Sequence, residues 1–329
     1  MPVKTLLPIL IVTLCTAHGQ EPPPDTAQPT TTLKIGTRIV GVSAVVLDSR
    51  NEPVKGLTKD DFILKQDGKD QEIRYFSQDS ELPLTLALMV DTSGSQKAFI
   101  EDETEASEKF FRVMLTRAAD RAVLVQFDYE VLQLQAMTNQ VQTLENALGF
   151  LSLPHPTGRP APPGGGGTLL YDGIVVASQK VLTNERGRRA MVILTDGVDN
   201  GSHSNLQQAI AAAQRADIVV YSVLYSMAES GFANGGYYPS MHASNRVNGR
   251  DVLNALSSAT GGRVFTVSPR TPLDLIYAQI EDDMRLQYQI GYTPPESQPG
   301  SYHKIELKTT ARHVTVQARQ GYYTPQAPQ

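Results

Sequence analysis

The stretch that most constrains the fold is LTLALMVDTSGS, residues 84 to 95, because an apolar run ends abruptly in closely spaced oxygen-bearing side chains. Leu84 to Val90 shows no alternation of apolar and polar residues, which is typical of a strand covered on both faces in a parallel sheet under helices. Ligands bind outside the carboxyl ends of the strands in such sheets. Asp91, Ser93 and Ser95 follow at a spacing of two. One carboxylate and two hydroxyls aimed at one point suit a hard cation.

Alone, this pattern also fits an ordinary turn, since Asp, Ser and Gly are common turn residues. Two further stretches favour the metal interpretation. GGGGTLLYDG places Thr168 at the start of a helix after a glycine run, and RRAMVILTDGVDN ends a second apolar strand at Asp196. Together the three loops supply five oxygen-bearing side chains.

With these residues in view, the chain resembles the von Willebrand factor type A domain family. The family's metal-ion-dependent adhesion site is built on Asp-x-Ser-x-Ser, a distant Thr and a distant Asp, and the matching residues here are Asp91, Ser93, Ser95, Thr168 and Asp196. The resemblance implies a doubly wound, mostly parallel α/β sheet of Rossmann-like type. It also implies a bound Mg²⁺ or Mn²⁺ that coordinates an Asp or Glu carboxylate of a partner protein.

The charge of this donor set favours ligand binding over catalysis. Serine and threonine hydroxyls are neutral, so only Asp91 and Asp196 offset the charge of the ion, which stays electrophilic and attracts an anion. We interpret the neighbouring Asp172 and Asp199 as capping residues, or as residues that support the ligands, rather than as ligands themselves.

The amino-terminal residues predict export. Residues 1–19 carry Lys4, an apolar core and a small-residue site, which is typical of a secretory signal peptide cleaved after Gly19. The only cysteine, Cys15, lies inside this segment, so the mature chain has no disulfide. We expect a secreted or periplasmic bacterial protein. Residues 20–32 are rich in Pro and Thr and predict a disordered linker.

The two ends of the remaining chain predict β structure. Residues 33–80 contain strand-like segments and a hairpin with Asp67-Gly68 at its bend, and residues 286–325 contain three more alternating segments. Because such a group is marginal alone, we expect both ends to form one small β-sandwich with the A-type domain, residues 81–285, inserted between them. Two separate small sheets are the alternative.

The insert alternates strands and helices, as a doubly wound sheet requires. Its first helix, within EDETEASEKFFRVMLTRAA, carries an acidic run that we interpret as solvated surface. Its last helix, from about Pro272 to Arg285, is predicted to run into the strand at 286–293 with no Gly or Pro between them. The resemblance implies that ligand binding displaces this last helix, which would couple the metal site to the β domain.

A long loop, residues 227–251, follows the strand that ends near Tyr225. Tyr237 and Tyr238 lie among glycines there and are candidate partner contacts, since tyrosine supplies contact area at low entropic cost. A disordered insertion is the alternative.

Other functional classes fit less well. A net charge of -5 and a pI near 5.7 give no basic patch, so nucleic acid is not an expected partner. The Asp-Thr-Ser-Gly stretch lacks the second aspartate motif of an aspartic protease, and GGGGT lacks the lysine of a phosphate-binding loop. We therefore expect no enzyme activity. The alternatives are a metal-independent structural component of an envelope complex and, less favoured, a metal-dependent hydrolase.

Overall fold

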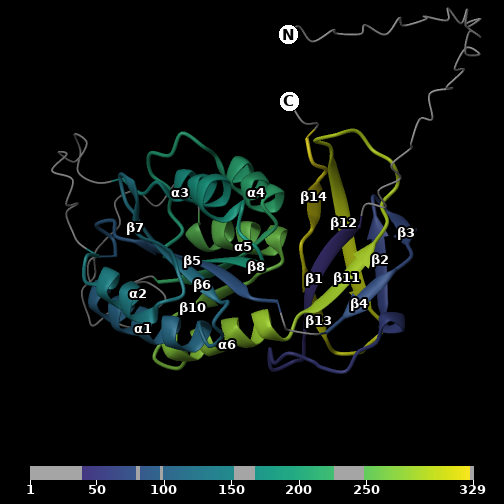
Figure 1. The fold of residues 1–329 in the computed structure, drawn as a ribbon, viewed down its shortest axis with the longest axis horizontal. Coiled ribbons are helices and arrows are strands. Elements are labelled where there is room, and N and C mark those ends of the chain that lie inside the picture. The colour runs from purple at the N-terminus through teal and green to yellow at the C-terminus, as the bar shows by residue number, and fades with distance from the viewer. Residues whose placement is uncertain (1–38, 79–81, 97–98, 152–166, 226–247, 327–329) are drawn as a thin grey trace, which may run out of the picture. The chain divides into compact units, whose positions relative to one another are not determined.

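The structure is a computed structural model, and it describes residues 39–78, 82–96, 99–151, 167–225 and 248–326 (Figure 1). The predicted signal peptide, the predicted linker and the candidate contacts Tyr237 and Tyr238 lie outside these residues. Within the described residues, no helix is long and apolar enough to cross a membrane.

The central part of the chain forms a six-stranded sheet. Its strands run in the order β10 (Val264–Thr266), β9 (Ile218–Leu224), β8 (Arg188–Thr195), β5 (Leu84–Asp91), β6 (Arg121–Phe127) and β7 (Val131–Thr138). All neighbouring pairs are parallel except β6 and β7, which are antiparallel. Every residue of β5 is buried, as its unbroken apolar run predicts for a strand covered on both faces.

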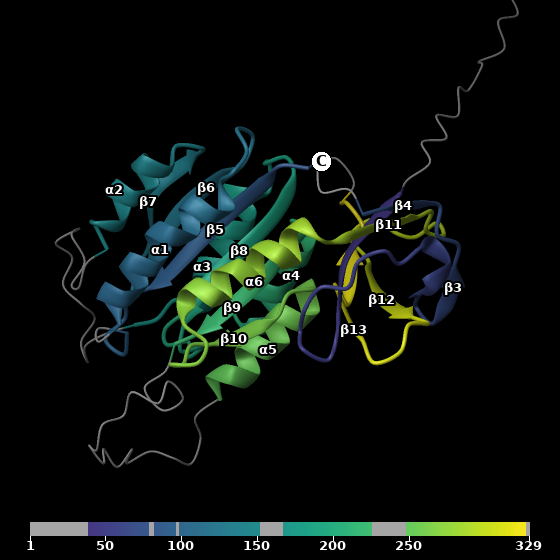
Figure 2. The same cartoon turned by 90° about the horizontal axis from the view of Figure 1, so that it is seen from below.

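Helices cover both faces of this sheet (Figures 1 and 2). One face carries α1 (Ile100–Met114), α2 (Val141–Leu148) and α6 (Leu273–Arg285). The other carries α3 (Leu170–Val176), which continues as a π-helix at Ala177–Leu182, together with α4 (Leu206–Arg215) and α5 (Gly249–Thr260). Alternate residues of β5 enter the two cores, with Leu86 and Leu88 on the α1 side and Ala87 and Met89 on the α3 side. The predicted doubly wound α/β fold is confirmed.

The two ends of the chain form two four-stranded antiparallel sheets with a shared core. The first has the order β13 (Thr315–Ala318), β1 (Val40–Leu47), β11 (Tyr288–Tyr292) and β4 (Tyr75–Ser77). The second has the order β14 (Gly321–Tyr323), β12 (Tyr302–Thr309), β2 (Phe62–Gln66) and β3 (Lys69–Gln71), with a short 3₁₀ turn at Lys59–Asp61 before β2. Each sheet takes strands from both ends of the chain, so the alternative of two separate sheets is wrong.

The predicted hairpin bend joins β2 to β3. Asp67 and Gly68 both have positive φ, 50° and 78°, as a two-residue turn of the primed type requires.

The connection from the last helix to the β-sandwich is direct (Figure 2). α6 ends at Arg285 and β11 begins at Tyr288, so only two residues lie between them. The Arg285 side chain, at the end of α6, donates to Asp120 Oδ2 at 2.7 Å, and the Asp120 side chain is fully buried. The helix end is thus anchored to the sheet before the chain enters the sandwich. The exact domain boundaries at residues 81 and 285 stay a prediction.

Candidate metal centre

The predicted ligands lie in loops at the carboxyl-terminal edge of the six-stranded sheet. Asp91 is the last residue of β5, and Ser93 and Ser95 follow in the next loop. Asp196 directly follows β8, which pairs in parallel with β5, so the two aspartates leave neighbouring strands at the same edge. Thr168 precedes α3 and is tied to the loop after β8 by two backbone hydrogen bonds with Asn200, each 2.9 Å long. The fold therefore brings the three loops together.

Hydrogen bonds fix the Asp91 carboxylate. Its Oδ1 accepts from the backbone amide of Ser93 at 2.9 Å, and its Oδ2 accepts from Thr195 Oγ1 at 2.6 Å. Beyond it, the Oγ atoms of Ser93 and Ser95 lie 3.1 Å apart. The predicted spacing of two thus does bring two hydroxyls side by side next to an oriented carboxylate.

Thr195 is a positioning residue that was not identified from the sequence. Besides donating to Asp91, its Oγ1 accepts from the amide of Gly197 at 3.1 Å, so one hydroxyl links the ends of β5 and β8. Gly197 has a φ of 79°, and a Cβ there would lie 2.5 Å from the carbonyl oxygen of Gly249 at the start of α5. The Thr-Asp-Gly sequence after the strand was the available signal, because the threonine orients Asp91 and the glycine permits the close packing.

The electrostatics of Asp91 favour a bound cation. Its side chain is fully buried, and burial raises its pKa to about 7 even though hydrogen bonds from Thr195 and Ser93 act in the opposite direction. The negative charge of Asp196 raises the pKa further. A carboxylate held out of water beside a second carboxylate is stabilised by any positive charge placed next to both.

Glu103 corrects the expectation that the acidic run of the first helix is solvated. Its side chain lies on the buried face of α1 and has no exposed surface, and neither of its carboxyl oxygens has a hydrogen-bond partner. Burial raises the pKa of Glu103 well above its ordinary value, and the charges of Asp91 and Asp102 add to this. The run EDETE gave no signal of this burial, because its other members are exposed or half-buried.

Asp172 and Asp199 act as the predicted capping residues. Asp199 Oδ1 accepts from the amide of Tyr171 at 3.0 Å, in the first turn of α3. Asp172 accepts from the amides of His203 at 2.9 Å and Ser204 at 2.8 Å. These bonds tie the start of α3, and with it the predicted threonine ligand, to the loop after β8.

The donor set consists of two carboxylates and three hydroxyls, all of them hard oxygen donors, which is the chemistry that Mg²⁺ and Mn²⁺ prefer. No group of three or more His, Cys, Asp or Glu side chains able to hold a metal occurs in the described part of the chain. The residues present therefore fit a hydroxyl-rich magnesium-type centre rather than a zinc centre of histidines and cysteines.

Comparisons with solved structures return chains of the same general fold at low identity. The conserved hypothetical protein BatB from Bacteroides thetaiotaomicron is 15% identical with a TM-score of 0.46, covering 61% of this chain and 98% of that one. The vWF domain of the type V pili tip protein Mfa5 from Porphyromonas gingivalis is 13% identical with a TM-score of 0.45, covering 61% and 94%.

Proximal thread matrix protein 1 from the mussel byssus, in a structure with a zinc-occupied MIDAS motif, is 15% identical with a TM-score of 0.45, covering 68% of this chain and 50% of that one. No curated protein matches the sequence. The family model of the von Willebrand factor type A domain matches residues 85–279, which contain the whole six-stranded sheet except Leu84 and all its helices except the last turns of α6. The chain belongs to the von Willebrand factor type A domain family.

Proposed function

We propose that the chain is a divalent-metal-dependent protein-binding module that acts in adhesion or assembly and has no enzyme activity. The observation that carries the proposal is the Asp91 carboxylate, which is fully buried at the strand end and oriented by Thr195 next to the paired hydroxyls of Ser93 and Ser95. A buried carboxylate with a raised pKa and adjacent hydroxyl donors is well suited to a cation.

In this proposal Asp91, Ser93, Ser95, Thr168 and Asp196 hold Mg²⁺ or Mn²⁺. When bound, the ion supplies an electrophilic position that accepts an Asp or Glu carboxylate of a partner protein. The chain orients Asp91 through Thr195 and holds the Thr168 and Asp196 loops together through the Asn200 backbone pair. The three hydroxyl donors add no negative charge, so the site retains attraction for an anionic group.

Two further parts of the proposal concern residues outside the described structure. Residues 1–19 direct export to the periplasm or the exterior as a signal peptide, and Tyr237 and Tyr238 contribute contacts to the partner. Replacing both tyrosines by serine should weaken partner binding and leave ion binding unchanged.

The metal part is tested by titrating the chain with Mg²⁺ and Mn²⁺ in a calorimeter. We expect Asp91→Ala and Thr168→Ala each to abolish ion binding while circular dichroism shows an intact fold, because both residues act at loop ends. Asp128→Asn is the matched control, since this buried aspartate follows the neighbouring strand β6 at the same edge but is outside the donor set. Unchanged ion affinity in both alanine variants would exclude the proposed ligands.

A metal-independent structural role is the competing function. It predicts that partner binding survives a chelator, whereas the metal-dependent module loses its partner in EDTA. The measurement that closes the Discussion separates the two.

A further inference from the structure

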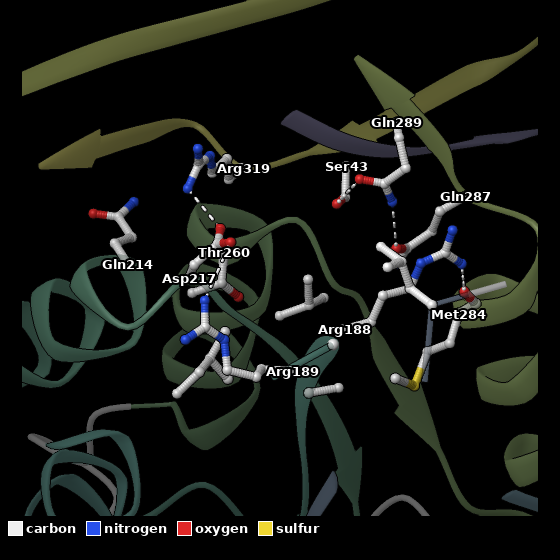
Figure 3. A pocket seen from close by; sticks show the side chains of 15 residues that line it. Ser43, Arg188, Arg189, Gln214, Asp217, Thr260, Met284, Gln287, Gln289 and Arg319 are labelled. Atoms are coloured by element: carbon white, nitrogen blue, oxygen red, sulfur yellow. Dashed lines mark hydrogen bonds and ion pairs between the residues drawn. The ribbon is translucent and has the colours of Figure 1, made fainter. Parts of the chain in front are cut away.

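A small cavity lies away from the metal centre, where the amino-terminal end of β8 meets the β-sandwich (Figure 3). Its volume is about 120 Å³, and both parts belong to the compact unit of residues 38–329. Arg188 and Arg189 reach it from the start of β8, and Asp217 from the turn before β9. Gln289 and Arg319 reach it from the sandwich.

The wall of this cavity is strongly basic. Among the lining residues that the structure describes, the charged side chains are Arg188, Arg189, Arg319 and Asp217, so three cations face one carboxylate. Arg319 Nη1 donates to Asp217 Oδ1 at 2.7 Å, and Arg189 Nη2 lies 3.5 Å from Asp217 Oδ2. Figure 3 shows these two arginines on either side of the aspartate, with Arg188 lying apart from them. One carboxylate shared between two guanidinium groups leaves two positive charges unbalanced.

Two donors at the cavity lack acceptors. The Nε atoms of Arg189 and Arg319 are buried and have no hydrogen-bond partner. Arg319 does use its other nitrogens, on Asp217 and on the carbonyl oxygen of Gly41. A buried donor of a charged group that makes no hydrogen bond is costly, more so than a neutral one. Acceptor oxygens with negative charge would remove that cost.

The third arginine shows the same electrostatic imbalance. Burial lowers the pKa of Arg188, and the positive charges of Arg285 and Arg117 lower it further. Its guanidinium donates to the carbonyl oxygen of Met284. The positive form of this side chain is therefore disfavoured by its surroundings, and a nearby anion would stabilise it.

We propose that this cavity binds a small tetrahedral oxyanion of the phosphate or sulfate class. Its volume is that of about four water molecules, which is room for an ion with four oxygens. Guanidinium groups bind such oxygens through paired N–H donors, and charge-assisted bonds of this kind are among the strong ones. Because Arg189 belongs to the A-type domain and Arg319 to the sandwich, the bound anion bridges the two.

The test is calorimetry on the full chain in EDTA, with sodium phosphate and sodium sulfate as probes and sodium chloride to hold the ionic strength constant. We expect one anion per chain and a Kd raised at least tenfold in Arg189→Gln and in Arg319→Gln. Arg121→Gln is the matched control, since Arg121 begins β6 as Arg188 begins β8 but pairs with Glu185 outside the cavity. Its Kd should equal that of the wild type.

Three results would overturn the assignment. The first is phosphate and sulfate heats no different from those of chloride, which would mean ionic screening only. The second is equal weakening in the Arg121 control. The third is acetate binding as tight as phosphate, which would exclude a site for four oxygens.

A second measurement covers variants that fail to fold. A ligand that binds only the native state raises the melting temperature with its concentration, so phosphate should stabilise the wild-type chain beyond the effect of chloride. Asp91→Ala should show the same phosphate shift, because the metal centre lies at the other end of the strands. A missing shift in the wild type contradicts the anion site and leaves the metal proposal untouched.

Discussion

Replacing Glu103 by Gln should change how the stability of the protein depends on pH. The substitution keeps the size and shape of the side chain but removes a buried carboxyl group that has no hydrogen-bond partner. Because the native pKa is raised well above the ordinary 4.5, the unfolded chain releases this proton at a lower pH than the native one. The wild type therefore loses stability relative to the variant as the pH rises from about 4.5 to the native pKa.

The magnitude follows from linkage. Where the native state holds one proton more than the unfolded state, the free energy of unfolding falls by about 1.4 kcal/mol per pH unit. The assay is urea unfolding followed by circular dichroism at several pH values from 5 to 8, in EDTA so that no cation alters the charge near Asp91. The wild-type curve should fall by about that slope relative to the Glu103→Gln curve until the native pKa is reached.

The matched control is Glu101→Gln, which removes an exposed carboxylate from the same turn of α1 and should keep the wild-type pH dependence. Parallel pH curves for the wild type and Glu103→Gln would refute the reasoning, since they would show that Glu103 does not titrate differently in the native and unfolded states.

Asp172→Ala should lower the free energy of unfolding at neutral pH by about 2 kcal/mol, since burial opposes ionisation but hydrogen bonds from the Ser204 and His203 region prevail and lower the Asp172 pKa to about 2. That difference is present above pH 3.8 and should shrink in urea unfolding as the pH falls toward 2; a pH-independent difference would contradict it. Arg285→Met should cost about 3 to 5 kcal/mol in the same assay, because it leaves the buried Asp120 carboxylate without its cation, and a loss below 1 kcal/mol would show that this pair does not anchor α6. Two glycines inserted between Arg285 and Leu286 should abolish any ligand-induced change in hydrogen exchange of residues 286–323, since α6 enters β11 directly. If the parent chain with Mg²⁺ and ligand shows no such change, α6 is only a tether.

The sheet and its helices were predictable because each signal is local. The apolar run of β5 and the similar run of β8 indicate strands buried on both faces, and both proved to be adjacent and parallel. The direct passage from α6 to β11 was likewise visible as the absence of Gly and Pro. The order β10-β9-β8-β5-β6-β7 was not predictable, since nothing local specifies which strands become neighbours.

The sandwich shows where local signals end. Alternating segments at both ends predicted strands that pair across the chain, but not that β1 lies between β13 and β11 while β2 lies between β12 and β3. Those choices depend on contacts between residues more than 200 positions apart, such as the bond from the Tyr292 hydroxyl to Gln66 Oε1 at 2.6 Å.

At the candidate site, spacing predicted which side chains share the sheet edge but not what supports them. Thr195 had a recognisable signal in its Thr-Asp-Gly sequence, whereas the burial of Glu103 had none, because hydrophilic residues at the start of a helix usually face solvent. The basic cavity required the folded arrangement, since Arg189 and Arg319 are 130 positions apart in the sequence.

The central claim is that the Asp91 centre binds a partner protein through a divalent ion. The most direct test is capture of proteins from native extract on the immobilised chain, in Mg²⁺ and in EDTA, with Thr168→Ala as the matched variant. The account predicts a partner retained by the wild type in Mg²⁺, released by EDTA and not captured by Thr168→Ala. Capture of the same partner in EDTA, or by the variant as well as by the wild type, would contradict it and establish a metal-independent dock.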